Sequence, residues 1–340
     1  MAGSTIYDIA KKAGVSIATV SRVVNNSEGI ADKTREKVLK VADELGYYPQ
    51  AYAQGLARKK KNIIMVVVPV LSNYFFMEVL AGIQDEISKY NYDLNIFNVQ
   101  SNGDDNMFPQ VENIIKRQWA DGYLFISTHL RDTELEQLQN YDMPITLIDE
   151  SYPGMDSVSV DDEKGIEKAM HYFLDNGMTR IAMISAMKTS KPGRQRIEGY
   201  KKALNEAGVA VEEDLIVTGD SMYRDGFSEQ NGYEAMIKLL ELPNPPKACF
   251  CTSDIQAVGA MKAMKEKGIQ IPIIGYDDIT ISNFIGLSTI RQPMYDMGEL
   301  ATKKLMKRMK NREAKPEHKV FAPELILRSS TETEIKEEDS

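Results

Sequence analysis

The 340-residue sequence contains few of the residues on which metal, redox and membrane proteins depend. Two cysteines, Cys249 and Cys251, cannot form a disulfide framework, and the three histidines are scattered without metal-ligand spacing. The longest apolar run, Ile63 to Leu71, is far shorter than the roughly 20 residues needed to cross a bilayer. The first residues also lack the basic and apolar regions of a secretory signal. We therefore expect a cytoplasmic protein with no membrane partner.

Sequence motifs for catalysis are missing as well, since no GxGxxG, P-loop or GxSxG pattern occurs. The segment Cys249-Phe250-Cys251 could suggest a metal site, but two thiols on an apolar strand are more typical of a protein core. The sequence therefore predicts no enzyme, no catalytic residue, no metal and no cofactor.

Basic residues are outnumbered over the whole chain, with 41 Lys and Arg against 50 Asp and Glu and a net charge of −9. The balance is uneven along the sequence, because residues 1–62 hold 11 basic and 6 acidic side chains whereas residues 63–340 hold 30 and 44. A small basic part joined to a large acidic part predicts a nucleic-acid-binding module attached to a module of another kind. Residues 331–340 form an acidic tail.

The first 48 residues, within this basic part, predict three short helices. Thr5 stands three residues before Asp8, a pattern typical of a capped helix start, and Gly14 ends this first helix. Ser16 can cap a second helix, and a third is expected from Asp32 through Leu45. The inner face of the third helix is predicted to be Val38, Leu39, Val41, Ala42 and Leu45. Two short helices joined by a tight turn and braced by a third form a helix-turn-helix.

The outward face of the second helix carries hydroxyl, amide and guanidinium groups, which suit contacts to DNA. These outward residues are Ile17, Ala18, Thr19, Ser21, Arg22 and Asn25. Hydroxyls and amides bind phosphate oxygens, and Arg22 can bind a guanine edge with two hydrogen bonds. A purely structural three-helix unit is the alternative interpretation of the helical pattern.

The residue string itself resembles the DNA-binding head of the LacI/GalR family of bacterial repressors. The resemblance is carried by Thr5-Ile6-Tyr7-Asp8-Ile9-Ala10, Ala13-Gly14-Val15-Ser16 and Ala18-Thr19-Val20-Ser21-Arg22-Val23-Val24-Asn25, and by Leu45-Gly46-Tyr47-x-Pro49. It extends over nearly the whole chain and implies a regulator that binds double-stranded operator DNA as a homodimer. The head residues assigned to DNA are Thr5, Ser16, Ile17, Ala18, Thr19, Ser21, Arg22, Asn25 and Tyr47.

Residues 49–61 form the predicted linker between the head and the rest of the chain. The resemblance implies that this segment becomes a hinge helix only on operator DNA, with Leu56 inserted as an apolar wedge into the minor groove. Lys59 and Lys60 belong to the basic run Arg58-Lys59-Lys60-Lys61, which we expect to contact phosphates. The alternative is that this run is simply a solvated linker.

Residues 62–330 alternate strand-like apolar runs with helical stretches, which predicts an α/β fold of parallel sheets flanked by helices. The expected strands are Ile63–Val68, Leu94–Val99, Gly122–Ile126 and Ile145–Ile148, then Ile181–Ser185, Leu215–Thr218, Ala248–Thr252 and Ile273–Tyr276. Two such series predict two lobes, residues 62–161 with 293–323, and residues 162–291 with 324–330. The resemblance implies a periplasmic-binding-protein-like (type I) body.

In that fold the ligand lies between the lobes, near the carboxyl ends of the strands. The residues found there by sequence, and expected to bind a small effector, are Asn73, Phe75, Asp149, Arg196, Ser253, Asp254 and Asp277. Carboxylates and a guanidinium converging on an aromatic side chain suit the hydroxyls and the C–H face of a sugar. Ser253 stands where many relatives carry Asn, and each carboxylate could instead cap a loop.

Three functions agree with this pattern to different degrees. The first is a transcriptional repressor of carbohydrate-metabolism genes that responds to a sugar-type effector. The second, within the family, is a global catabolite regulator whose corepressor is a phosphorylated phosphocarrier protein. Lys303 and Glu324 stand where such regulators offer arginines to the phosphoserine, which disfavours this possibility. The third is a soluble sugar-binding receptor without DNA activity, which the intact head disfavours.

Overall fold

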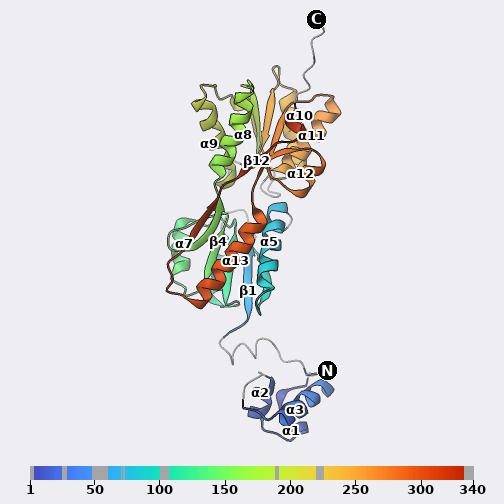
Figure 1. Cartoon of the computed structure of the whole chain (residues 1–340), viewed down its shortest axis with the longest axis vertical. Helices are drawn as coiled ribbons and strands as arrows, with labels where there is room; N and C mark the ends of the chain where they lie inside the picture. The colour runs from blue at the N-terminus through green and yellow to red at the C-terminus, as the bar shows by residue number, and fades with distance from the viewer. Residues whose placement is uncertain are drawn as a thin grey trace. The chain divides into compact units, whose positions relative to one another are not determined.

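The computed structural model describes residues 4–24, 29–47, 60–69, 71, 73–99, 107–187, 191–219 and 226–332 (Figure 1). The predicted DNA contacts Asn25, Leu56 and Lys59, and all of the acidic tail beyond residue 332, lie outside these ranges. The chain divides into two units, a head that ends near Ile63 and a body that holds nearly all the rest. None of the described helices is long and apolar enough to cross a membrane.

The head contains the three predicted helices, α1 (Ile6–Ala13), α2 (Ile17–Val24) and α3 (Asp32–Glu44). The start of α1 is capped as expected, because the backbone N–H and the hydroxyl of Thr5 both donate to the Asp8 carboxylate, at 2.8 and 2.7 Å. The start of α2 is capped by Ser16, whose Oγ accepts from the backbone N–H of Thr19 at 3.1 Å.

The three head helices bury a small apolar core between them. Its members are Ile9, Ala10, Ala13, Val20, Val23, Val38, Val41 and Ala42. Leu39 was expected on the inner face of α3, but that prediction is wrong, because its side chain is 50% exposed. Positions 38, 41 and 42 lie on one side of a helix with 3.6 residues per turn, and the position after 38 points about 100° away from that side.

Two six-stranded sheets form the body and confirm the predicted α/β fold class. The first has the order β11-β5-β4-β3-β1-β2, where β1 is Ile63–Val68, β2 Asp93–Asn98, β3 Gly122–Ile126, β4 Ile145–Ile148, β5 Asp156–Val160 and β11 His318–Phe321. The second has the order β12-β10-β9-β8-β6-β7, where β6 is Ile181–Ser185, β7 Ile216–Thr218, β8 Ala248–Cys251, β9 Ile273–Asp277, β10 Ser288–Arg291 and β12 Glu324–Ile326. Four of these strands, β5, β10, β11 and β12, were not among the predicted runs.

Helices cover the faces of the two sheets (Figure 1). Those that follow strands of the first sheet are α5 (Tyr74–Ile87), α6 (Phe108–Lys116), α7 (Asp132–Gln139) and α8 (Asp162–Asp175). The remaining ones are α9 (Lys191–Glu206), α10 (Glu229–Leu240), α11 (Asp254–Lys267), α12 (Thr280–Phe284) and α13 (Met294–Lys310), with 3₁₀ turns at Glu213–Leu215 and Ser329–Thr331. The chain passes between the sheets after β5, after β10 and after β11, so each lobe contains segments distant in sequence.

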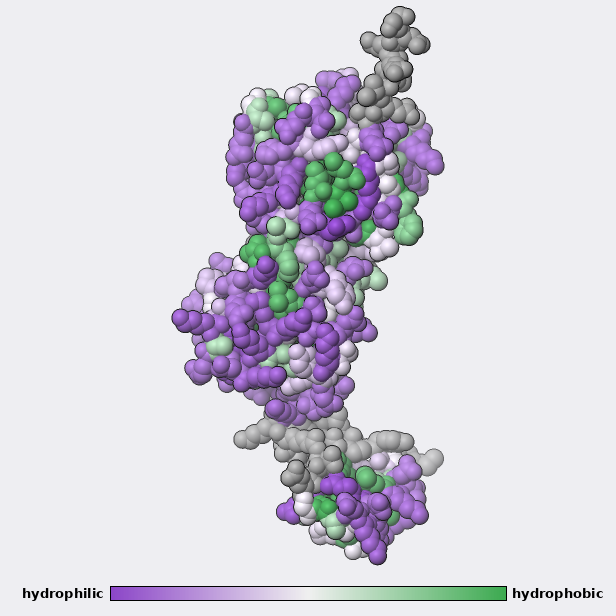
Figure 2. Space-filling view, in the orientation of Figure 1, coloured by the Kyte–Doolittle hydropathy of each residue, from purple (hydrophilic) through white to green (hydrophobic). Residues whose placement is uncertain are grey.

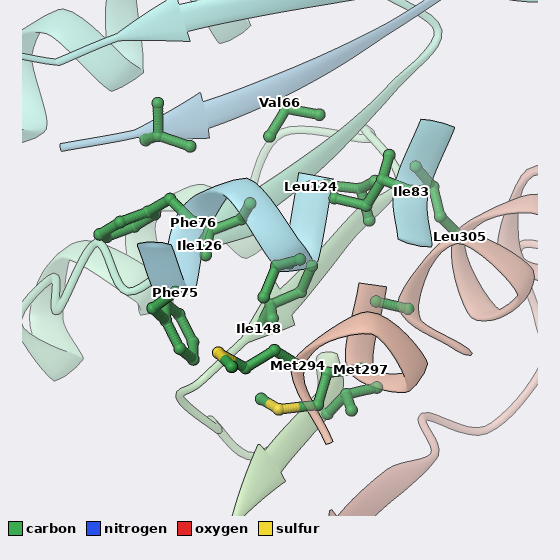
Figure 3. Packing of buried hydrophobic residues seen from close by; sticks show 14 of the residues in the cluster. Val66, Phe75, Phe76, Ile83, Leu124, Ile126, Ile148, Met294, Met297 and Leu305 are labelled. Atoms are coloured by element: carbon green, nitrogen blue, oxygen red, sulfur yellow. The ribbon is translucent and has the colours of Figure 1, made fainter. Parts of the chain in front are cut away.

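The core of the first lobe lies between its sheet, α5 and α13 (Figure 3). Val66, Leu124, Ile126 and Ile148 from the strands face Phe76 and Ile83 of α5 and Met294, Met297 and Leu305 of α13. The two helices approach closely because a glycine of each stands at the crossing. A Cβ atom on Gly82 would lie 2.0 Å from the backbone oxygen of Tyr295, and one on Gly298 would lie 2.1 Å from that of Val79.

Candidate functional sites

Arg196 is the centre of a polar cluster at the carboxyl ends of the strands in the second sheet. It projects from α9 and is 7% exposed. Its Nη1 donates to the backbone oxygen of Thr252 at 2.6 Å, and its Nη2 donates to Oδ1 of Asp162 at 3.2 Å. Its guanidinium lies over the Tyr276 ring, 4.3 Å from the ring centroid, and the Tyr276 hydroxyl donates to the same Asp162 oxygen at 2.7 Å.

This cluster keeps the buried guanidinium charged. Burial by itself lowers the pKa of Arg196, but the nearby groups Asp162, Tyr276, Asp277 and Asp149 raise it, and they outweigh burial. The Nε of Arg196 has no hydrogen-bond partner among the described residues, although it is buried.

Two carboxylates predicted as effector contacts lie close to this arginine. Asp277 ends β9 with φ at +117°, and its Oδ1 accepts from Nε2 of Gln292 at 2.7 Å. Burial raises the pKa of Asp277 well above its ordinary value, against the opposing effect of Arg196. Asp149 follows β4 in the first sheet with φ at +67°, and its Oδ2 accepts from Oγ of Ser127 at 2.6 Å. Arg196 is thus influenced by carboxylates from both sheets.

A small pocket adjoins the cluster and is lined from both lobes. Its lining residues are Asn73, Tyr74, Phe227, Ser253, Ile255, Asp277 and Ile279. Two of the predicted ligands in it also cap helices, since Asn73 Oδ1 accepts from the N–H of Phe75 and Ser253 Oγ accepts from that of Gln256. Aromatic and apolar walls beside a carboxylate and a guanidinium can bind a small polyhydroxylated molecule.

Two predicted effector contacts have partners inside one lobe, and their contact with an effector stays a prediction. Phe75 is 8% exposed and belongs to the core of the first lobe, where Figure 3 shows its ring directed toward Met294. Asp254 is fully buried inside the second lobe, and its oxygens accept from Ser282 Oγ at 2.6 Å, Thr289 Oγ1 at 2.5 Å and the N–H of Ile279 at 3.0 Å. We assign Phe75 to packing and Asp254 to an internal hydrogen-bond network.

Sequence reasoning missed Asp162 and Gln292, which hold Arg196 and Asp277. Each follows a strand that was not predicted, since Asp162 comes after β5 and Gln292 after β10. Both strands contain Ser or Thr at buried positions, for example Ser157 and Thr289. Neither strand is therefore a continuous apolar run in the sequence, which is the pattern from which strands were predicted. In folds of this kind the ligand site is formed by residues that follow the carboxyl ends of parallel strands. This rule could have identified Asp162 and Gln292, but only if β5 and β10 had been recognised as strands.

On the head, the predicted DNA contacts lie on the part of α2 that faces away from the core. Ile17, Ala18 and Arg22 are exposed, and Thr19 and Ser21 are half-buried. Thr5 and Ser16 are exposed but use their hydroxyls as the helix caps described above, and Tyr47 packs against the head core. Lys60 is exposed in the linker.

The buried Asp254 predicts a pH dependence of stability. Burial raises the pKa of Asp254 to about 7, against the three hydrogen bonds that lower it. Between about pH 4 and pH 7 the folded chain keeps a proton that the unfolded chain has released, so the free energy of unfolding falls as pH rises through this window. In Asp254→Asn an amide that does not titrate replaces the carboxyl group. The pH-dependent part of the free energy of unfolding that is due to Asp254, up to about 4 kcal/mol, is therefore expected to be absent in this variant.

Denaturant unfolding of wild type and Asp254→Asn, followed by circular dichroism across this pH range, measures the difference. The matched control is Asp175→Asn, since Asp175 is an exposed carboxylate at the end of α8. The control is expected to follow wild type at every pH. Parallel curves for wild type and Asp254→Asn would show that the buried carboxyl is ionised throughout.

Family comparisons agree with both units of the structure. The profile of the bacterial regulatory proteins of the lacI family matches residues 5–50, and that of the periplasmic binding protein-like domain matches residues 170–331. Catabolite control protein A of Priestia megaterium is 36% identical, and the alignment covers 96% of this chain and 99% of that protein.

Solved structures of lacI-family proteins resemble this chain as well. A lac repressor dimer bound to operator and the anti-inducer ONPF has 26% identity and a TM-score of 0.81, covering 97% of this chain and 99% of that one. A LacI family regulator from Enterococcus faecium with bound ribose has 28% identity and a TM-score of 0.68, and the match covers 79% of this chain and 98% of that one. The chain belongs to the lacI family and is a DNA-binding transcriptional regulator with an effector-binding body rather than an enzyme.

Proposed function

We propose that this regulator represses carbohydrate-metabolism genes and that a small sugar-type effector, bound between the lobes, controls its affinity for operator DNA. The observation that carries the proposal is the cluster of Arg196, Asp162, Asp149 and Asp277 beside the aromatic walls of the pocket. Charged groups that donate and accept at fixed angles are the usual partners of sugar hydroxyls. The ribose-bound relative from Enterococcus faecium supports a ligand of this class.

The position of these groups suggests how the effector acts. Asp149 belongs to the first sheet, whereas Arg196 and Asp277 belong to the second. A ligand that contacts both favours one arrangement of the lobes over another, and only such differential contact can shift the equilibrium between them. Since the linker enters the first lobe at β1, a change between the lobes alters the spacing of the two linkers in a dimer.

On the DNA side, we propose that α2 enters the major groove and that Arg22 recognises a guanine, with Ile17, Ala18, Thr19, Ser21 and the other head residues assigned above in supporting contacts. The exposed residues of α2 are spaced so that they share one helix face, the spacing that a recognition helix needs. Lys60 adds a phosphate contact that carries no sequence information.

We further propose that the functional unit is a homodimer on a pseudo-palindromic operator, because one head reads too few base pairs. The visible surface of the body is mostly hydrophilic, with limited apolar areas (Figure 2). Among the described residues the most exposed large apolar side chain is Phe284 of α12, at 78%, and Ile96 of the edge strand β2 is 48% exposed. Exposed apolar side chains on an edge strand are a typical site of association.

The second candidate function, expected from the sequence, is a regulator whose corepressor is a phosphorylated phosphocarrier protein, and the similarity to catabolite control protein A favours it. Ion pairs disfavour it. Lys303 Nζ lies 2.9 Å from the Glu299 carboxylate, and Glu324 lies 3.5 Å from Arg291. A paired lysine and an acid offer a phosphoserine less than two arginines would. The third possibility, a receptor without DNA activity, is disfavoured by the lacI-type head.

Removing one charged ligand on either lobe should weaken effector binding. Calorimetric titration of a monosaccharide panel that includes D-ribose should give a dissociation constant roughly 10- to 100-fold larger for Asp149→Asn and for Arg196→Lys, since each loses charge-assisted hydrogen bonds. Asp175→Asn is again the control, and the melting temperature of each variant verifies folding. Wild-type affinity in both variants would exclude the cluster as the effector site.

Base recognition and phosphate contact should separate on the head side. Arg22→Ala is expected to lose roughly 1–3 kcal/mol of discrimination at one base pair, whereas Lys60→Ala should weaken operator and random DNA alike and reduce the salt slope by about one. Fluorescence anisotropy with both DNAs over a salt series measures each effect. Equal losses on operator and random DNA in Arg22→Ala would contradict base readout by this residue.

The dimer prediction concerns Phe284. Phe284→Glu should give a monomer at concentrations where the wild type is a dimer, because a carboxylate replaces apolar area in the interface. The matched control is Leu39→Glu on α3 of the head, whose side chain is 50% exposed and does not belong to the body. Light scattering over a dilution series measures the mass of each variant. A dimeric Phe284→Glu, or a wild type that is monomeric throughout, would count against this interface.

A further inference from the structure

The acidic body contains a strongly basic stretch at residues 303–319. It holds eight Lys and Arg, namely Lys303, Lys304, Lys307, Arg308, Lys310, Arg312, Lys315 and Lys319, against the two acids Glu313 and Glu317. The 30 basic and 44 acidic residues of 63–340 thus leave 22 and 42 outside this stretch. We call residues 303–319 the basic segment. Its charge is opposite to that of the body around it.

The basic segment lies at the amino-terminal edge of the first sheet. Arg308 Nε is 2.8 Å from Oδ2 of Asp156, the first residue of β5, and a Cβ atom on Gly122, the first residue of β3, would lie 3.0 Å from Met309 Sδ. Since β1 pairs in parallel with β3, with Ile64 opposite Gly122, the start of β1 is at this same edge. Figure 1 shows the end of α13 and the start of β1 at one end of the lobe.

Several cations of the segment are used inside the fold. Lys304 and Lys307 both pair with Glu317, Arg308 pairs with Asp156, and Arg312 pairs with Asp142. Further acidic groups at this edge and in the elements beside it include Asp93, Glu112, Asp121 and Glu313.

Lys310, Lys315 and Lys319 are exposed and have no carboxylate within 4.0 Å in the described part of the chain, and Lys319 instead lies over the Phe321 ring. Lys310 lies in the last turn of α13, where a cation stabilises the helix dipole, but Lys315 lies beyond the helix and gains nothing from it. The segment as a whole holds eight basic and two acidic side chains, and this excess of positive charge on the surface of an acidic body indicates an anionic partner.

We propose that the face of the body around Lys310 and Lys315 binds the phosphate backbone of DNA that flanks the operator. This inference rests on the proposed DNA-binding function. The 15 residues between Tyr47 and Ile63 span at most about 55 Å when fully extended, so a head docked on DNA keeps the start of β1 within that distance of it, and this face lies at the same edge of the sheet as that start. In the sequence, the run Arg58-Lys59-Lys60-Lys61 comes just before β1, which begins at this edge.

The test uses the full-length protein and two duplexes, an operator obtained by selection from random DNA, and the same operator extended by about one helical turn at each end. The variant is Lys310→Gln with Lys315→Gln. Its control is Lys238→Gln with Lys265→Gln, two exposed lysines that also lie in the last turns of their helices, α10 and α11. Binding is measured by fluorescence anisotropy over a salt series.

For the wild type, the extended duplex should give a salt slope steeper than that of the short duplex by about 2 to 4, since each phosphate contact contributes about 0.9. The Lys310/Lys315 variant should lose this increment and bind the extended duplex roughly 10-fold more weakly at low salt, with unchanged binding to the short one. The control should behave as wild type.

Equal slopes on the two duplexes for the wild type, or an unchanged increment in the Lys310/Lys315 variant, would overturn the inference and leave an acidic protein as the partner of this face. Failure of the wild type to bind even the short operator would instead contradict the proposed DNA-binding function. The two failures are therefore distinguishable in one experiment.

Discussion

The candidate effector site depends on one constraint, the burial of a permanent positive charge at Arg196. A buried charge without partners costs several kcal/mol, so the fold has to bring acceptors to it. Asp162 comes from the start of α8, Tyr276 from β9 and the Thr252 oxygen from the end of β8. The contacts with the guanidinium hold α8, β8 and β9 in fixed positions relative to one another. This arrangement places the polar ends of these strands around the pocket.

The distribution of charge separates the two activities of the molecule. The basic head and linker carry the attraction to phosphates, whereas most of the acidic body repels them. In the proposed mechanism, an effector bound between the lobes acts through their arrangement and not by competing for DNA. Since the chain passes between the sheets three times, a displacement of one lobe is transmitted through β5, β10 and β11 together.

Local patterns predicted the elements that a short apolar run or a helix cap defines. The caps at Thr5 and Ser16 formed as expected, and β1, β3, β4 and β6 have the predicted bounds, because each is a continuous buried run between turns. The edge strands β11 and β12 escaped notice, since their mostly exposed residues leave no apolar signature. Patterns identify strands by burial, and a strand with little burial cannot be recognised from them.

The sequence by itself determined the family, the helix-turn-helix, the α/β class and Arg196, Asp149 and Asp277 as groups at strand ends. Only the tertiary structure decided which side chains meet. It joined Asp162 to Arg196 and Gln292 to Asp277, and it withdrew Phe75 into a core and Asp254 into an internal network. The reason is physical: position along a strand or helix follows from local periodicity, whereas burial and partners depend on segments far apart in the chain that pack together only in the folded state.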